Sequence, residues 1–223
     1  MAQTLDVTSM DQNTAHEALE SALAKLDDSQ SIIIESNQDL RPLLPALQEK
    51  QWGAFDWAPL IDGPQLWQVE LTRCADAPSG RSIRGMLATD HRRCDLLFAA
   101  LEESVQNGDM DATEKLNQQF QLAMIRHFRM EEDVFFPAFE QRTGMTQGPT
   151  TVMRMEHDQM RGIMSQMAEA VSAKSLDAVQ RTFSTLLVLM QQHNIKEEQM
   201  LYAMGDQQLG DMAQDLLKKM QKL

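Results

Sequence analysis

The chain is poor in histidine, cysteine and positive charge. Its 223 residues include five histidines, two cysteines and one tyrosine, and the formal net charge is −13. Such an acidic chain disfavours nucleic acids and anionic membranes as partners, because both are polyanions. Two cysteines, Cys74 and Cys94, do not make a disulfide framework, so we expect a reducing, cytoplasmic location.

Long apolar runs are also missing, and we expect no secretion signal. No apolar run approaches the roughly 18 residues that a membrane-spanning helix needs. The first residues include Asp6 and lack the apolar segment of a signal peptide. We therefore expect no membrane partner, and we interpret the apolar stretch 186–190 as part of a folded core.

The composition changes near residue 78. Residues 1–80 hold 13 acids, four bases and all three tryptophans, whereas residues 81–223 hold 20 acids, 16 bases and 15 of the 17 methionines. The segment 75–80 contains the proline, serine and glycine typical of a linker. The sequence therefore predicts two domains, 1–78 and 79–223.

The first domain alternates strand-like and helical stretches. The isoleucines of 31–35 favour a buried strand, and Gly63 with Pro64 favours a hairpin connection. The order β-α-β-α-β-β predicts a small α+β two-layer sandwich. The expected strands are 4–7, 31–35, 52–60 and 65–73, and the expected helices are 14–26 and 42–50.

This order, with Leu5-Asp6-Val7 at its start, resembles a small uncharacterised bacterial domain of the TusA-like sulfur-carrier fold. Sulfur carriers of that fold use a cysteine at the start of the first helix. Residues 9–14 contain no cysteine and Cys74 lies at the far end of the domain, so the nucleophile for sulfur transfer is missing. We expect this domain to dock a protein or redox partner instead.

The sequence predicts that the second domain is helical throughout. Good helix formers dominate, and residues that break helices occur only at plausible turns, such as Asn107-Gly108, Gly148-Pro149 and Gly205. Short connections make successive helices antiparallel, which predicts an all-α, up-down-up-down four-helix bundle. The expected long helices are 82–106, 110–142, 149–171 and 176–204, followed by a short extra helix at 207–221.

Four histidines form an internal repeat, with one in each expected long helix. They are His91, His127, His157 and His193, and 36 residues separate the members of each successive pair. An acid precedes the first histidine of each pair, and His-x-x-x-Glu-Glu begins at the second. The sequence therefore predicts a duplicated bundle. The fifth histidine, His16, lies outside the repeat, and we interpret it as a surface residue.

The repeat predicts a metal site. Residues four apart share a helix face, so His127 with Glu131 and His193 with Glu197 can each point two ligands inward. At about 1.5 Å of rise per residue, these side chains and the other two histidines lie near the same level of the bundle. Four imidazoles and two carboxylates suit a pair of transition metals, with iron first and zinc or copper as alternatives.

This layout resembles the hemerythrin-like (HHE cation-binding) family over residues 82–204, and Phe135-Phe136-Pro137 is similar to the family's usual sequence. The resemblance implies two iron ions in a carboxylate- and oxo-bridged centre, with Glu131 and Glu197 as the bridges. By position, the implied metal ligands are His91, His127, Glu131, His157, His193 and Glu197.

The ligand set differs from that of the oxygen carriers. Oxygen-carrying hemerythrins use five histidines, whereas this bundle offers four, which leaves more open positions on iron. The chain is more similar to family members that handle nitric oxide, oxidants or iron itself, including iron–sulfur cluster repair proteins. Those repair proteins carry an amino-terminal cysteine motif that this sequence lacks. The expected function is binding of dioxygen, nitric oxide or a related oxidant for sensing, detoxification or repair.

Other functions stay open. The chain could be an iron store or donor, a di-iron oxidase or reductase, or a metal-holding interaction scaffold, and it could form a homodimer. No substrate motif accompanies the metal ligands, so we expect a ligand-binding protein more than an enzyme.

The sequence leaves several neighbouring residues undecided. Asp95 and Cys94 follow His91 closely and are either part of the site or an ordinary polar residue and a buried thiol. Glu132 and Glu198 are either solvated or supports for the ligands, and the direction of Tyr202 is not determined. We expect four methionines near the ligands to pack an apolar pocket: Met124, Met153, Met160 and Met190.

Overall fold

The computed structural model describes residues 3–27, 30–40, 55–73 and 82–223. The chain forms two compact units, Met1–Arg81 and Ser82–Gln221. The expected helix at 42–50, the expected linker at 75–80 and Cys74 lie outside the described residues. In the described residues, no helix is both long enough and apolar enough to cross a membrane.

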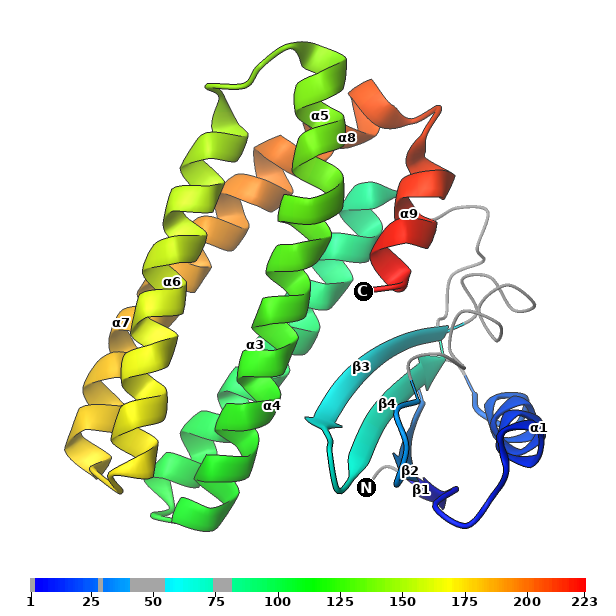
Figure 1. Cartoon of the computed structure of the whole chain (residues 1–223). Helices are drawn as coiled ribbons and strands as arrows, with labels where there is room; N and C mark the ends of the chain where they lie inside the picture. Colours follow the sequence, from blue (N-terminus) through cyan, green and yellow to red (C-terminus); the bar gives the residue numbers. More distant parts are fainter. Residues whose placement is uncertain (1–2, 28–29, 41–54, 74–81) are drawn as a thin grey trace. The chain divides into compact units, whose positions relative to one another are not determined.

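The first unit is a four-stranded mixed sheet with a helix packed on it, as the sequence predicted (Figure 1). The strands lie in the order β1-β2-β4-β3; β1 is parallel to β2, and the other neighbours are antiparallel. The elements are β1 (Gln3–Asp6), α1 (Gln12–Leu23), β2 (Ser31–Ser36), β3 (Phe55–Asp62) and β4 (Trp67–Arg73).

Alternation along the strands builds the core of this unit. Ile32 and Ile34 are buried on β2, and on α1 Leu19 and Leu23 are buried in the same cluster. Side chains two apart on a strand share a face, so β2 turns these two isoleucines toward the helix. Asp11 caps α1 by accepting a hydrogen bond from the backbone N–H of Asn13 at 3.0 Å.

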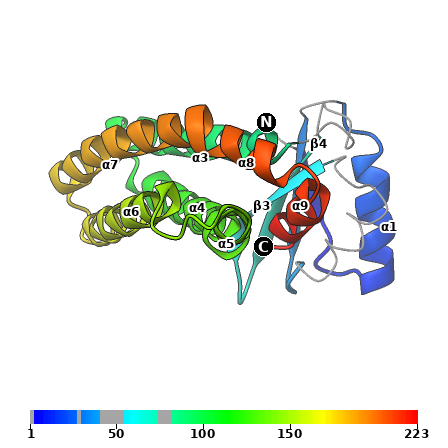
Figure 2. The same cartoon turned by 90° about the horizontal axis from the view of Figure 1, so that it is seen from above.

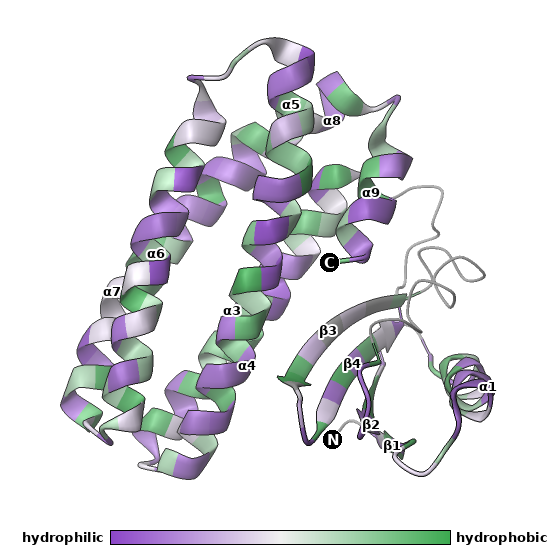
Figure 3. Cartoon of the chain, viewed as in Figure 1, coloured by the Kyte–Doolittle hydropathy of each residue, from purple (hydrophilic) through white to green (hydrophobic). Residues whose placement is uncertain are grey.

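The second unit is the predicted four-helix bundle, with α3 packed on α4 and α6 packed on α7 (Figure 2). Hydrophilic and hydrophobic stretches alternate along its long helices, as expected for amphipathic helices around one core (Figure 3). The long helices are α3 (Ile83–Gln106), α4 (Met110–Arg129), α6 (Pro149–Ser172) and α7 (Leu176–Lys196), and the shorter ones are α5 (Phe136–Thr143), α8 (Tyr202–Leu209) and α9 (Ala213–Gln221).

The core of the bundle is built from aromatic and methionine side chains. Phe98 of α3 stacks on Phe183 of α7, with ring centroids 3.9 Å apart. The four methionines expected near the ligands are all buried: Met124, Met153, Met160 and Met190. Three of them, Met124, Met160 and Met190, belong to the main hydrophobic cluster of the bundle.

The second and fourth helices each contain a π-helical segment. These segments are η2 (Met130–Phe135), between α4 and α5, and η3 (Glu197–Leu201), between α7 and α8. Their matching positions agree with the duplication that the sequence predicted. π-Helical turns inside α-helices are rare and occur often at functional sites.

The fourth helix is longer than the sequence predicted. Gly205 does not end it, because α8 continues to Leu209, and the last helix begins at Ala213 instead of residue 207. The reason is packing: a Cβ atom at Gly205 would lie 2.5 Å from Cε2 of the buried Phe135 ring. Glycine therefore serves here as a close-contact residue within a helix.

Candidate metal centre

Six buried side chains converge inside the bundle, and each is at most 3% exposed. Each long helix contributes one histidine, and η2 and η3 contribute the two carboxylates. We call His91 with His127 the first histidine pair and His157 with His193 the second histidine pair. The structure thus brings together all six residues singled out from the sequence: His91, His127, Glu131, His157, His193 and Glu197.

Both carboxylates lie between the two histidine pairs. Oε2 of Glu131 lies 3.4 Å from Nε2 of His127 and 3.2 Å from Nε2 of His157. Oε2 of Glu197 makes the matching contacts, at 3.2 Å to the other histidine of the first pair and 3.0 Å to the other histidine of the second. Each carboxylate therefore contacts one imidazole of each pair, which is the placement that bridging between two cations requires.

The π-helical segments set the direction of the residues that follow the carboxylates. In an α-helix, with 3.6 residues per turn, a side chain five positions after Glu197 points to another face. The π-turn closes its hydrogen bond at the fifth residue, and Tyr202 consequently returns to the face of Glu197. Its hydroxyl donates to Oε1 of Glu131 at 2.7 Å and to Oε2 of Glu197 at 2.9 Å.

A second ring of carboxylates orients the imidazoles. Each histidine directs Nε2 inward and donates a hydrogen bond from Nδ1–H to a carboxylate outside the centre. This contact fixes the orientation and the tautomer of the imidazole, as in many metal sites. Every one of these carboxylates lies next in sequence to one of the six convergent residues. The contacts are His91 with Glu198 at 2.9 Å, His127 with Asp90 at 3.0 Å, His157 with Glu132 at 2.7 Å and His193 with Glu156 at 2.9 Å.

Two of these four carboxylates were missed by sequence reasoning. The acids before His91 and His157 were read only as part of the repeat, yet Asp90 orients the histidine of α4 and Glu156 that of α7. The signal was present as a repeated acid–histidine step. The sequence could not show which histidine each acid contacts, because the contact joins different helices. Glu132 and Glu198, left undecided by the sequence, support the other two histidines.

Three of the four outer carboxylates also pair with an arginine or a lysine. Asp90 accepts from Arg126 at 3.2 Å and pairs with Arg93 at 2.9 Å. Burial raises the pKa of the Asp90 carboxyl, but Arg93, His127 and Arg126 outweigh it and hold the pKa far below its usual value. On the other outer carboxylates, Glu132 pairs with Arg161 and Glu156 with Lys196.

The negative charge of the inner carboxylates favours positive charge at the centre. Burial lowers the pKa of His91, yet its contacts with Glu197 and Glu198 outweigh burial and raise that pKa to about 10. In the second pair, Glu131 and Glu132 likewise outweigh burial and raise the pKa of His157 to about 9. The centre therefore attracts a cation, and a metal ion competes with protons for it.

Unsatisfied polar atoms fit the same interpretation. Among the described residues, Nε2 of His127, Oε2 of Glu131 and Oε1 of Glu197 are buried without a hydrogen bond. Such orphaned atoms cost free energy unless something compensates them. Imidazole nitrogen and carboxylate oxygen are donors that iron accepts readily, so the residues present fit a metal centre.

Aromatic rings cover His157 of the second histidine pair. The ring of Phe128 stacks on His157 with centroids 4.1 Å apart, and Phe136 lies at 5.9 Å on a nearly parallel plane. The guanidinium groups of Arg161 and Arg154 lie over these two phenylalanine rings. This side of the centre is therefore shielded from bulk water.

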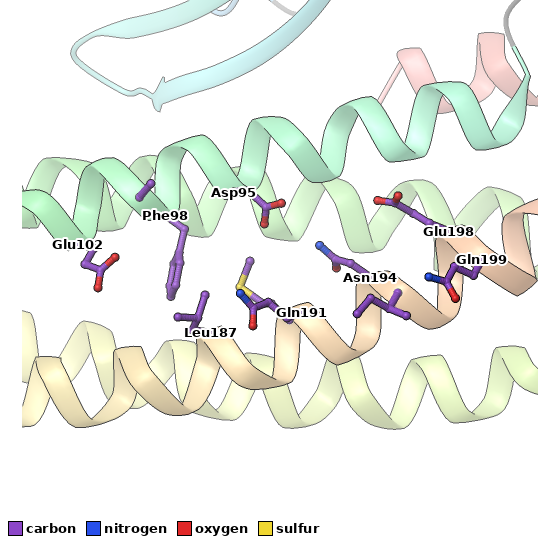
Figure 4. Close-up of a pocket in the computed structure, with 11 residues that line it drawn as sticks. Asp95, Phe98, Glu102, Leu187, Gln191, Asn194, Glu198 and Gln199 are labelled. Carbon is purple, nitrogen blue, oxygen red and sulfur yellow. The ribbon is translucent and has the colours of Figure 1, made fainter.

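A groove on the bundle has Glu198 in its lining, and Figure 4 shows the residues that line it. It lies between α3 and α7 with η3, has a volume of about 580 Å³, and is lined by Asp95, Phe98, Asn194 and Glu198 among others. Glu198 lines this groove and accepts a hydrogen bond from Nδ1–H of His91. Asp95 is exposed and belongs to this groove, and the six convergent residues do not include it.

Cys94 is a packed core residue and not a reactive thiol. It is 2% exposed, and burial raises the pKa of its thiol far above the usual value. A Cys74→Ser chain is therefore expected to resist thiol alkylation while folded, because only the thiolate reacts. Mass spectrometry after timed alkylation measures this, with the same chain in denaturant as the positive control. Rapid labelling of the folded chain would contradict the packing described here.

A four-helix bundle around buried histidines and carboxylates defines a class of metal-binding helical proteins. A family model described as the hemerythrin HHE cation binding domain matches residues 82–205. That match spans more than half of the sequence, and the chain belongs to this family. Residues 4–73 match a second family, described as an uncharacterized conserved protein (DUF2249). No curated protein and no solved structure matches the chain significantly.

Proposed function

We propose that the bundle binds two iron ions, one at each histidine pair, and that a small oxidant such as dioxygen or nitric oxide binds there. The observation that carries the proposal is the position of Glu131 and Glu197. Each carboxylate oxygen lies between imidazoles of different pairs, at 3.0–3.4 Å from their Nε2 atoms. A site for one ion would not need two such carboxylates.

The donor count leaves room for an exogenous ligand. Four imidazoles and two bridging carboxylates supply fewer donors than two six-coordinate ions accept. Iron, when bound, supplies open coordination positions and the electrons for a diatomic molecule. The chain contributes the fixed direction of the imidazoles, the aromatic cover of His157 and the groove that Glu198 lines.

Anaerobic titration of the iron-loaded chain tests this proposal. We expect two irons per chain and a spectral change that saturates with nitric oxide, and a separate change on exposure to dioxygen. The His91→Ala/His157→Ala chain, loaded in parallel, is expected to show neither change.

Other outcomes would replace the proposal with one of its rivals. Rapid loss of iron to a chelator without a nitric oxide complex would indicate an iron store. Sustained turnover with a reductant would indicate an oxidase or reductase. Zinc that stays bound with no redox response would indicate a scaffold.

A further inference from the structure

We propose that the Tyr202 oxygen is a ligand of the metal ion at the first histidine pair, which makes the two metal positions chemically different. This inference rests on the proposed iron centre. It concerns a residue whose direction the sequence did not determine, since Tyr202 lies five positions after Glu197 and beyond the His-x-x-x-Glu spacing.

Distances around the Tyr202 oxygen carry the inference. The phenol is fully buried, and its oxygen lies 2.7 Å from Oε1 of Glu131, 2.9 Å from Oε2 of Glu197 and 3.1 Å from Nε2 of His91. Two donor atoms that bind one ion at about 2.1 Å and at right angles lie about 3.0 Å apart. The phenol oxygen therefore has the spacing from all three atoms expected of donors that share one ion.

The number of donor atoms at each histidine pair also favours Tyr202 as a ligand. The second histidine pair has four mutually close donors, because Glu131 and Glu197 both join it within 4.8 Å. At the first pair only three such donors, from His91, His127 and Glu197, all lie within 4.8 Å of one another. The Tyr202 oxygen supplies a further donor on that side.

The duplication of the bundle shows that this donor is present in one half only. The residue five after Glu131 is Phe136, and the residue five after Glu197 is Tyr202. Both follow a π-helical segment, and both rings lie beside the first histidine of a pair, with centroids 5.9 Å from His157 and 5.5 Å from His91. The same place in the repeat thus holds a phenyl ring in one half and a phenol in the other.

Ligation by Tyr202 changes which oxidation state one of the two ions prefers. The phenol releases its proton to solvent as the metal–oxygen bond forms, and the resulting anionic oxygen attracts Fe(III) more strongly than Fe(II). The ion at the first pair is therefore easier to oxidise than the ion at the second pair. This difference gives a di-iron centre a defined site for the first electron to leave.

The experiment uses the full chain loaded with iron and oxidised to the ferric state. Tyr202 is the only tyrosine in the sequence, so every phenolate signal has a single source. We expect a visible phenolate-to-iron charge-transfer band and resonance-enhanced ring vibrations in the native chain. Both are expected to be lost completely in Tyr202→Phe, which removes one oxygen atom. Ring-deuterated tyrosine incorporated into the native chain must shift the vibrations, even if the variant folds poorly.

Iron content measured on the same samples separates the two proposals. Two ferric ions per chain without the charge-transfer band would overturn the role of Tyr202 and leave the proposed function standing. A band that survives in Tyr202→Phe, or vibrations that ignore the deuterium label, would also overturn it. A chain that binds no iron overturns the proposed function, and the Tyr202 inference falls with it.

Discussion

A His127→Ala/His193→Ala chain is expected to bind no iron under conditions in which the native chain binds two ions. The two histidines belong to different pairs, so each metal position loses one of its two imidazoles. Nε2 of His127 lies 3.4 Å from Glu131, and Nε2 of His193 lies 3.0 Å from Glu197. Alanine offers no donor, and each bridging carboxylate then lacks one of its imidazole neighbours. Metal analysis after anaerobic loading and desalting gives the ion count per chain.

The matched control is His16→Ala, which removes a histidine from the first unit. His16 pairs with Glu20, four residues further along the same helix, at 3.2 Å. We expect this chain to keep both ions, as well as the thermal stabilisation that bound metal gives a folded domain. Unchanged metal content in the double variant would refute the placement of one ion at each histidine pair.

Asp90→Ala is expected to cause the largest combined loss of stability and metal affinity among the outer carboxylates. Asp90 is buried and contacts Arg126 at 3.2 Å and Nδ1 of His127 at 3.0 Å. Removing one partner of a buried ion pair costs about 3–5 kcal/mol, because the remaining charge stays buried. Loss of a carboxylate that orients a metal-bound histidine costs about 10–100-fold in metal affinity. Denaturant unfolding of the metal-free chain and chelator competition measure the two effects separately.

The Glu198→Ala variant separates the effect of orienting a histidine from the effect on the stability of the fold. Its carboxylate supports His91 in the same way, but its side chain is 35% exposed and borders the groove. We expect a similar loss of metal affinity with only a minor change in the free energy of unfolding. Equal destabilisation by the two variants would mean that burial of the Asp90–Arg126 pair is not what stabilises the bundle.

Periodicity and spacing along the chain predicted most of the bundle. Apolar residues at helical spacing and turn residues between them gave the four long helices, because amphipathic helices must bury one face. The repeated His-x-x-x-Glu identified four of the six convergent residues, because positions four apart on a helix point the same way. The repeated spacing of 36 residues identified the other two, His91 and His157. In the first unit, the β-branched isoleucines of 31–35 and the turn at Gly63 predicted a strand and a hairpin that the structure contains.

Helix continuity was harder to predict, because it depends on contacts between distant segments. A glycine in a sequence usually favours a helix end, yet Gly205 lies within α8. Glycine is needed there because Phe135 occupies the space that a side chain would fill. The two π-helical segments likewise have no clear sequence signature, and they decide which way Tyr202 points.

The sequence by itself determined the kind of centre: four histidines and two glutamates at repeated spacings, with too little histidine elsewhere to offer another. It determined this because donor type and helical spacing are local properties of the chain. Only the tertiary structure decided which acid orients which histidine, since Asp90 and Glu156 reach across to neighbouring helices. It alone also decided that a phenol lies beside one histidine pair and a phenyl ring beside the other, because the packing of helices sets those distances.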